Sequence, residues 1–214
     1  NERSLAMIVE ATRRPRRYDP LLATGDPPVM CTLLPMVQAH RDAARALAAR
    51  AMLRLGAGRI EEAWQDTLAC HRLSRLTSQG GTIIELLVAI AIDGITCRAE
   101  RAILAQANLT AAQARQTYDD LGRLPPLPKM ANAIDLGERY MFLDCVQMLA
   151  DRGLAQLGSM VGGRPEDSSA LGGLLSAAGA VVIDWDVILR MGNSWYDRFV
   201  AAQRKPTRAE RLAA

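Results

Sequence analysis

Two histidines and two acidic residues are the side chains whose types and spacing could support chemistry. His40 and His71 fall on the apolar sides of two helical segments joined by a short turn. At a rise of about 1.5 Å per residue, His40 lies about 24 Å from a turn at residues 56–58 and His71 about 20 Å, so the two rings could meet. Glu85 could complete a metal site for zinc or iron. The favoured interpretation is a buried, neutral and hydrogen-bonded ring at each histidine, with no metal and no cofactor.

Glu138 is the second acidic candidate, because helical spacing places it among apolar residues. Two buried carboxylates, Glu85 with Glu138 or Asp93, could perform general acid and base catalysis. A buried Arg–Glu ion pair is the favoured interpretation, because the chain is rich in arginine. No catalytic residue is therefore assigned, and Glu85 and Glu138 remain candidates. A ferritin-like di-iron site is excluded, because neither histidine follows a glutamate by three residues.

The elements that must position these residues are predicted to be helices. Half of the chain is hydrophobic but only 4% is aromatic, which favours closely packed aliphatic helices. Helical spacing predicts a hairpin, an apolar central helix and two further helices, at about residues 36–55, 59–77, 82–101, 110–122 and 130–157. No alternating pattern indicates strands. The expected fold is all-α, an array or bundle of antiparallel helical hairpins with about six or seven helices.

The turn of the hairpin has the sequence GRIEEAW, at residues 58–64. This segment resembles the inter-helix turn of a tetratricopeptide repeat, which has glycine, a polar residue, an aromatic or aliphatic residue, two acidic or polar residues, alanine and a large apolar residue. The likeness covers residues 45–75, with Arg54 where the repeat favours tyrosine and no second copy at the repeat length of about 34 residues. The resemblance implies a hairpin within a helical array, in a class of scaffolds that mostly bind peptides or partner proteins. It implies no catalytic residue.

Four segments are predicted along the chain. They are an extended N-terminal arm with a short helix (1–33), a helical core domain (34–157), a glycine-rich mobile segment (158–181) and a C-terminal helix that docks on the core (182–214). A capping box from Thr207 to Glu210 announces a further helix close to the last residue, so the chain is expected to continue in a longer protein. The apolar segment after Thr82 is too short to cross a bilayer, and no transmembrane segment is predicted.

The C-terminal helix carries a candidate interaction face. Its aromatic residues are Trp185, Trp195, Tyr196 and Phe199. They are expected to dock on the core or on a partner protein. The net charge of +3 and an arginine cluster confined to residues 13–17 predict no nucleic-acid partner, with the cluster solvated or paired with acids.

The sequence therefore predicts a helical scaffold or protein-interaction domain without catalytic activity of its own. Its expected partner is another protein or the remainder of a longer chain, and a homo-oligomer is possible. Two alternatives stay open: a helical metal- or acid/base-dependent enzyme using His40, His71, Glu85 and Glu138, and a carrier of an apolar ligand. The four isolated cysteines are expected to be reduced. Nothing in the sequence indicates the localisation.

Overall fold

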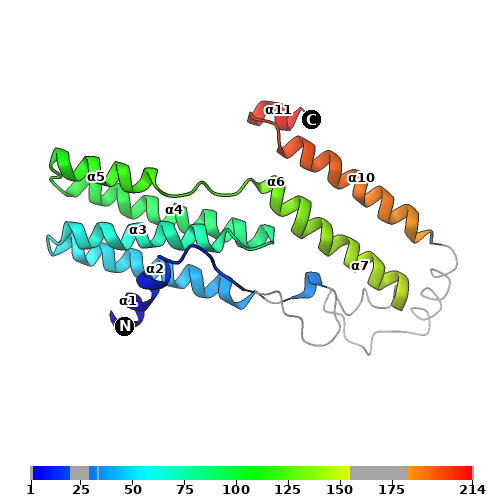
Figure 1. Cartoon of the computed structure of the whole chain (residues 1–214), viewed down its shortest axis with the longest axis horizontal. Coiled ribbons are helices and arrows are strands. Elements are labelled where there is room, and N and C mark those ends of the chain that lie inside the picture. The colour runs from blue at the N-terminus through cyan, green and yellow to red at the C-terminus, as the bar shows by residue number, and fades with distance from the viewer. Residues whose placement is uncertain (1, 20–28, 33, 155–182, 214) are drawn as a thin grey trace. The chain divides into compact units, whose positions relative to one another are not determined.

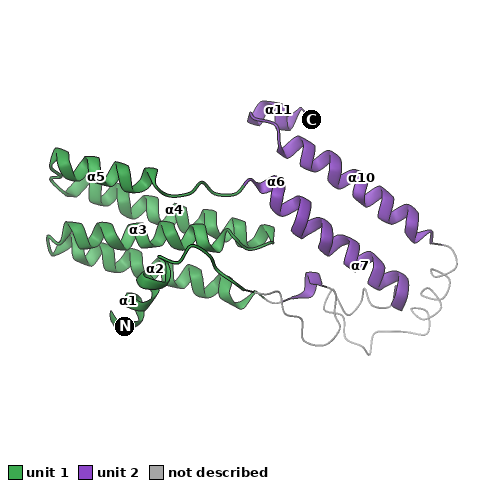
Figure 2. Ribbon diagram, in the orientation of Figure 1, with its two compact units in different colours: residues 1–19, 34–128 green, residues 20–33, 129–214 purple. Residues whose placement is uncertain are grey.

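The computed structural model describes residues 2–19, 29–32, 34–154 and 183–213. Within these ranges the chain forms helices and their connections, without a strand (Figure 1). The predicted all-α class is confirmed. The chain divides into two compact units, which are described one at a time (Figure 2). Unit 1 comprises residues 1–19 and 34–128, and unit 2 comprises residues 20–33 and 129–214.

Unit 1 is built on the predicted helical hairpin. Helix α2 (Pro35–Gly56) begins with proline, whose missing N–H has no partner at the start of a helix in any case. Gly58 has a φ of 74°, the left-handed conformation that glycine adopts without strain, and it closes the turn. Helix α3 (Ile60–Thr77) then packs along α2. The hairpin is confirmed, with helix ends within one residue of those predicted.

Helix α4 (Ile83–Gln106) packs against both α2 and α3. It begins at a capping box in which Thr82 and Glu85 each satisfy a backbone N–H of the other. The three helices share a core of Ala44, Leu47, Ala69, Cys70, Leu73 and Ile92. The opposite face of α4 exposes four apolar side chains, Ile84, Leu87, Ile90 and Leu104. Helix α4 therefore buries one face only, whereas a central helix buried on all sides was predicted.

The N-terminal segment belongs to unit 1. Helix α1 (Glu2–Ala11) packs three apolar side chains, Leu5, Ile8 and Val9, against the shared core. After α1, the backbone N–H of Arg17 donates to Gln79 Oε1 (2.9 Å), and Gln79 Nε2 donates to the carbonyl of Pro15 (3.0 Å). These bonds hold residues 15–17 against the end of α3. Helix α5 (Ala111–Gly122) begins at a capping box of Thr110 with Gln113, close to the predicted start at residue 110, and completes the unit.

Unit 2 contains two long helical segments. The first is continuous through α6 (Met130–Ala133), a π-helical stretch η2 (Ile134–Glu138) and α7 (Arg139–Arg152). Helix α10 (Trp185–Gln203) packs on it, and a side chain at Gly192 would overlap the ring of Phe142. The short elements are η1 (Val29–Cys31) and α11 (Arg208–Leu212). Helix α11 begins at the predicted capping box of Thr207 and Glu210.

The two units do not follow the predicted segments. The helical stretch at 130–152 groups with the C-terminal helices rather than with the hairpin. The four-segment division stays a prediction, and its glycine-rich segment, 158–181, lies outside the described residues. Among the helices that the structure describes, none combines the length and apolarity needed to cross a membrane.

Candidate functional site

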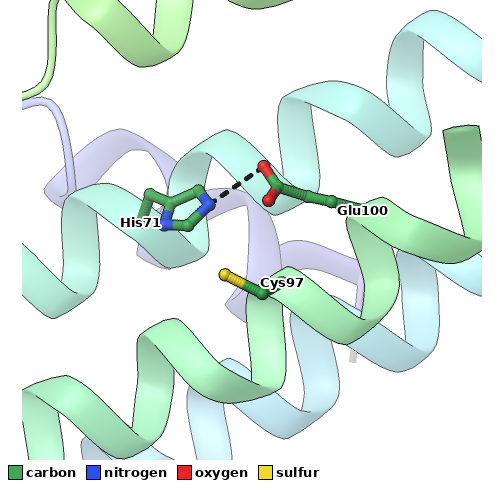
Figure 3. Close-up of side chains that lie close together, drawn as sticks. All are labelled: His71, Cys97 and Glu100. Atoms are coloured by element: carbon green, nitrogen blue, oxygen red, sulfur yellow. Dashed lines mark hydrogen bonds and ion pairs between the residues drawn. The ribbon is translucent and has the colours of Figure 1, made fainter.

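A cluster of charged side chains surrounds His71, at the seam between α3 and α4. His71 is only 4% exposed. Its Nδ1–H donates to Asp93 Oδ1 (2.7 Å) and its Nε2–H to Glu100 Oε1 (2.9 Å). The two acids stand two turns apart on α4, so both face α3. Cys97 lies one turn from each acid, and its sulfur points toward the imidazole (Figure 3).

Two carboxylates keep the buried imidazole charged. Burial alone lowers the pKa of His71, but the hydrogen bonds and charges of Asp93 and Glu100 outweigh burial and raise that pKa from 6.5 to about 9. Burial acts against the charge of Asp93 as well, yet His71 and Arg75 lower its pKa. Arg75 Nη1 donates to both oxygens of Asp93, at 2.7 and 2.6 Å. The predicted burial of His71 is confirmed, and the predicted neutral ring is wrong, because the acids of α4 meet it.

We expect the free energy of unfolding of the metal-free protein to decrease between pH 6.5 and about pH 9. The pKa of His71 in the folded protein, about 9, lies above its ordinary value of 6.5 in the unfolded chain. The charged imidazolium therefore contributes its full stabilisation below pH 6.5, and this contribution is lost as the pH rises through 9. A pKa shift of this size corresponds to a change of about 3 kcal/mol in the free energy of unfolding. Urea denaturation across this pH range, with a chelator present, measures the free energy of unfolding. The matched variant His71→Gln should show a much flatter profile, and equal slopes in the two proteins would refute the assignment.

A second cluster joins the N-terminal segment to the start of α4. Glu85 is 2% exposed and forms an ion pair with Arg17. It also accepts hydrogen bonds from the N–H and Oγ1 of Thr82, at 3.2 and 3.0 Å. The structure thus contains the Arg–Glu pair that was favoured for a buried acid. Arg17 additionally lies within 3.2 Å of Asp19, so this member of the arginine cluster is paired with acids.

His40 borders this second cluster rather than the first. Thr77 Oγ1 lies 3.1 Å from His40 Nδ1, and Arg17 Nη1 lies 3.4 Å from the same nitrogen. Burial and the charge of Arg17 lower the pKa of His40. Thr77 lies about 9 Å farther along α3 than His71. The predicted grouping of His40, His71 and Glu85 is therefore not assembled, because the two histidines belong to separate clusters.

The paired-carboxylate hypothesis gains no geometric support in unit 1. Asp93 is bound by His71 and Arg75, and Glu85 by Arg17. Glu138 belongs to unit 2, where it is partly buried and its carbonyl accepts a hydrogen bond from Tyr196 Oη (3.2 Å). A pairing of Glu85 with Glu138 stays a prediction.

The predicted aromatic face lies on α10. Tyr196 packs against Phe142 of α7, with ring centroids 5.7 Å apart. The ring centroid of Trp195 lies 5.1 Å from that of Tyr196 and 5.0 Å from that of Phe199. Trp195 is 50% exposed. Trp185 is partly buried at the start of the helix. Part of this face therefore closes the α7–α10 pair, and its use as an interaction face stays a prediction.

A groove between α2 and α4 was not anticipated from the sequence. It encloses about 710 Å³ and is open to solvent. Small and apolar side chains make up most of its lining: Ala48, Ala49, Met52, Ala91, Gly94, Ile95 and Ala99. The remaining lining residues are arginines, Arg41, Arg45 and Arg98, and no acid lines it. Of these, Arg45 pairs with Asp42 (3.2 Å), whereas within the described ranges Arg41 and Arg98 form no ion pair.

The sequence did carry a signal for the His71 cluster. Asp93, Cys97 and Glu100 recur at steps of four and three on a mainly apolar helix, which places them on one face of it. Polar residues on the buried face of a mainly apolar helix predict charged partners on the neighbouring helix. In the structure these partners are His71 and Arg75 of α3.

No protein-family model, no curated protein and no solved structure matches this chain. The resemblance to a tetratricopeptide repeat therefore stays a prediction.

Proposed function

We propose that unit 1 is a helical protein-interaction domain without catalytic activity of its own, and that it binds an acidic amphipathic helix of a partner protein. The observation that carries the proposal is the groove between α2 and α4. The chain turns back after α2 and again after α3, so α2 and α4 run in the same direction. These two helices form the walls of the groove. An amphipathic helix laid in a hydrophobic groove is a recurring mode of peptide recognition.

The lining of the groove suits a closely approaching helix. Ala48, Ala91 and Gly94 project little from the walls, so the apolar side chains of a bound helix can reach the floor. A Cβ atom added at Gly94 would meet no other atom within 4 Å, so the groove has free space next to this residue.

The charge of the groove indicates the chemistry of the partner. Arg41 has a buried Nε without a hydrogen-bond partner among the described residues. The Nε of Arg98 makes only a long bond of 3.3 Å to the carbonyl of Gly94. Glutamates or aspartates beside the apolar stripe of a partner helix would pair with both arginines. Such complementarity favours the correct partner and speeds association.

Two fluorescently labelled helical peptides test the proposal by fluorescence anisotropy. Both carry the same stripe of leucine and alanine, flanked by glutamate in one peptide and by lysine in the other. The acidic peptide should bind and the basic one should not. Gly94→Leu fills the groove and should weaken binding more than about tenfold, a loss of about 1.4 kcal/mol.

Matched charge reversals supply the control. Arg98→Glu should weaken binding of the acidic peptide, whereas Arg115→Glu, on the exposed surface of α5, should leave it unchanged. Equal losses in both variants, or no preference between the peptides, would refute the groove as the binding site. A homodimer in sedimentation that dissociates in Gly94→Leu would replace the partner helix with a second copy of this chain. The helical-enzyme and apolar-carrier alternatives stay predictions.

A further inference from the structure

We propose that His71, Cys97 and Glu100 form a zinc-binding site at the α3–α4 seam, with Asp93 orienting the histidine. The proposed site is independent of the groove, and it differs from the grouping of His40, His71 and Glu85 considered from the sequence.

The three ligand atoms are already close together. One nitrogen of His71, the sulfur of Cys97 and a carboxylate oxygen of Glu100 all lie within 4.8 Å of one another. Zinc–ligand bonds of about 2.0 to 2.3 Å place neighbouring ligands in a tetrahedron roughly 3.3 to 3.7 Å apart. The widest separation therefore has to shorten by at most roughly 1 Å, and the Nε2–Oε1 separation of 2.9 Å has to lengthen slightly. Side-chain rotation can supply both changes. Cys97 and Glu100 are three residues apart on α4 and share a face, and both point at the imidazole (Figure 3).

The surroundings of His71 match those of a metal-binding histidine. Its Nδ1–H donates to Asp93, which is itself held by two bonds from Arg75. This carboxylate fixes the ring orientation and leaves Nε2 facing Glu100 and Cys97. Metal-bound histidines almost always donate their other N–H in this way, and the carboxylate partner makes the ring a stronger ligand.

The donor set and the charge balance favour zinc. Imidazole and thiolate ligands suit zinc, whereas calcium and magnesium take oxygen ligands. Zinc would displace the proton on His71 Nε2 and the proton on the Cys97 thiol, and both protons would leave to solvent. Before zinc binds, the positive charges of His71 and Arg75 balance the negative charges of Asp93 and Glu100. After the exchange, zinc and Arg75 balance Asp93, Glu100 and the Cys97 thiolate, so the net charge of the cluster stays zero. Cys97 is exposed, so the fourth zinc position would be open to water or to a ligand.

Cobalt and zinc titrations of the full chain, stripped of metal by a chelator, test the site. Cobalt should bind in a 1:1 ratio with the visible bands of tetrahedral cobalt and a thiolate-to-cobalt charge-transfer band. Zinc should displace it, and competition with a colorimetric chelator gives the zinc affinity. Cys97→Ser is nearly isosteric at an exposed position, so it should fold. It should lose the charge-transfer band and weaken zinc binding more than about 100-fold, since losing an outer-shell partner alone costs about 10- to 100-fold.

Two further variants separate this site from incidental binding. Cys31→Ser removes an exposed cysteine of unit 2 and should leave the spectrum and affinity unchanged. Asp93→Asn should weaken zinc binding about 10- to 100-fold while the charge-transfer band persists at saturation. The absence of a tetrahedral cobalt spectrum, or zinc binding unchanged in Cys97→Ser, would overturn the proposal.

Discussion

Replacing Asp66 with alanine is expected to lower the free energy of unfolding by about 3 to 5 kcal/mol, because it removes the buried counter-charge of a buried arginine. Within the described residues, the remaining acidic partner of Arg50 is Glu2, whose side chain is 78% exposed. Asp66 is 1% exposed and Arg50 is 7% exposed. Arg50 donates to both oxygens of Asp66, from Nη2 at 2.6 Å and from Nε at 3.0 Å. Arg54 Nη1 adds a third bond at 2.7 Å. The hydrogen bonds of Asp66 contribute most to raising the pKa of Arg50, although burial opposes that charge.

Urea denaturation followed by circular dichroism measures this loss. Glu62→Ala is the matched control, because Glu62 also pairs with Arg54 (3.4 Å) but its side chain is 48% exposed. That exposed pair should contribute about 0 to 1 kcal/mol. Combining Asp66→Leu with Arg50→Met should be less destabilising than Asp66→Ala alone, because both buried charges are then removed together and Arg54 keeps its pair with Glu62. Equal losses in Asp66→Ala and Glu62→Ala would show that the buried pair has no special role.

Replacing Trp64 with alanine is expected to cost about 3 to 5 kcal/mol through the cavity that it leaves. Trp64 is 5% exposed and borders a small cavity of about 20 Å³ that Ile103 of α4 and Leu109 also line. Its Nε1–H donates to Asp120 Oδ2 of α5 (3.1 Å), which ties α3 to α5. Truncation therefore removes apolar packing and a hydrogen bond together.

The variant Trp64→Phe weights the two contributions differently, because it keeps a six-membered aromatic ring in the core and removes the N–H donor with the rest of the indole. Its cost should be about 1 to 2 kcal/mol. Leu53→Ala is a surface control, since Leu53 is 74% exposed, and should change stability by less than about 0.5 kcal/mol. Urea midpoints of the three variants rank the effects. If Trp64→Phe cost as much as Trp64→Ala, the hydrogen bond rather than the packed volume would dominate.

The local features of the chain could be predicted from the sequence because their causes lie within a few residues. Helical spacing determines α2 and α3, and Gly58 determines the turn between them. The caps at Thr110 and Thr207 are bonds between residues three apart. The burial of Trp64 and His71 follows from the apolar stripe of a single helix.

The division into units depended on packing. A proline-rich connector occupies residues 124–128. Whether the helix after it returns to the hairpin or pairs with another segment is not a local property. Gly192 facing Phe142 allows α10 to approach α7 closely, and this pairing joins residues about fifty positions apart. The first compact unit therefore ends at residue 128, and the helical stretch that follows belongs to the second.

The charge state of the candidate site was decided only by the tertiary structure. Apolar spacing placed His71 in the core, which by itself predicts a neutral ring. Asp93 and Glu100 are 22 and 29 residues away along the chain, and Asp66 is 16 residues from Arg50. Such pairs form only when two helices pack at a particular register, because a shift of one residue turns a side chain by about 100° around its helix. The sequence by itself determined that His71 is buried, because the apolar stripe of its own helix covers it. The register of α3 against α4 decided that two carboxylates and a thiol lie beside it.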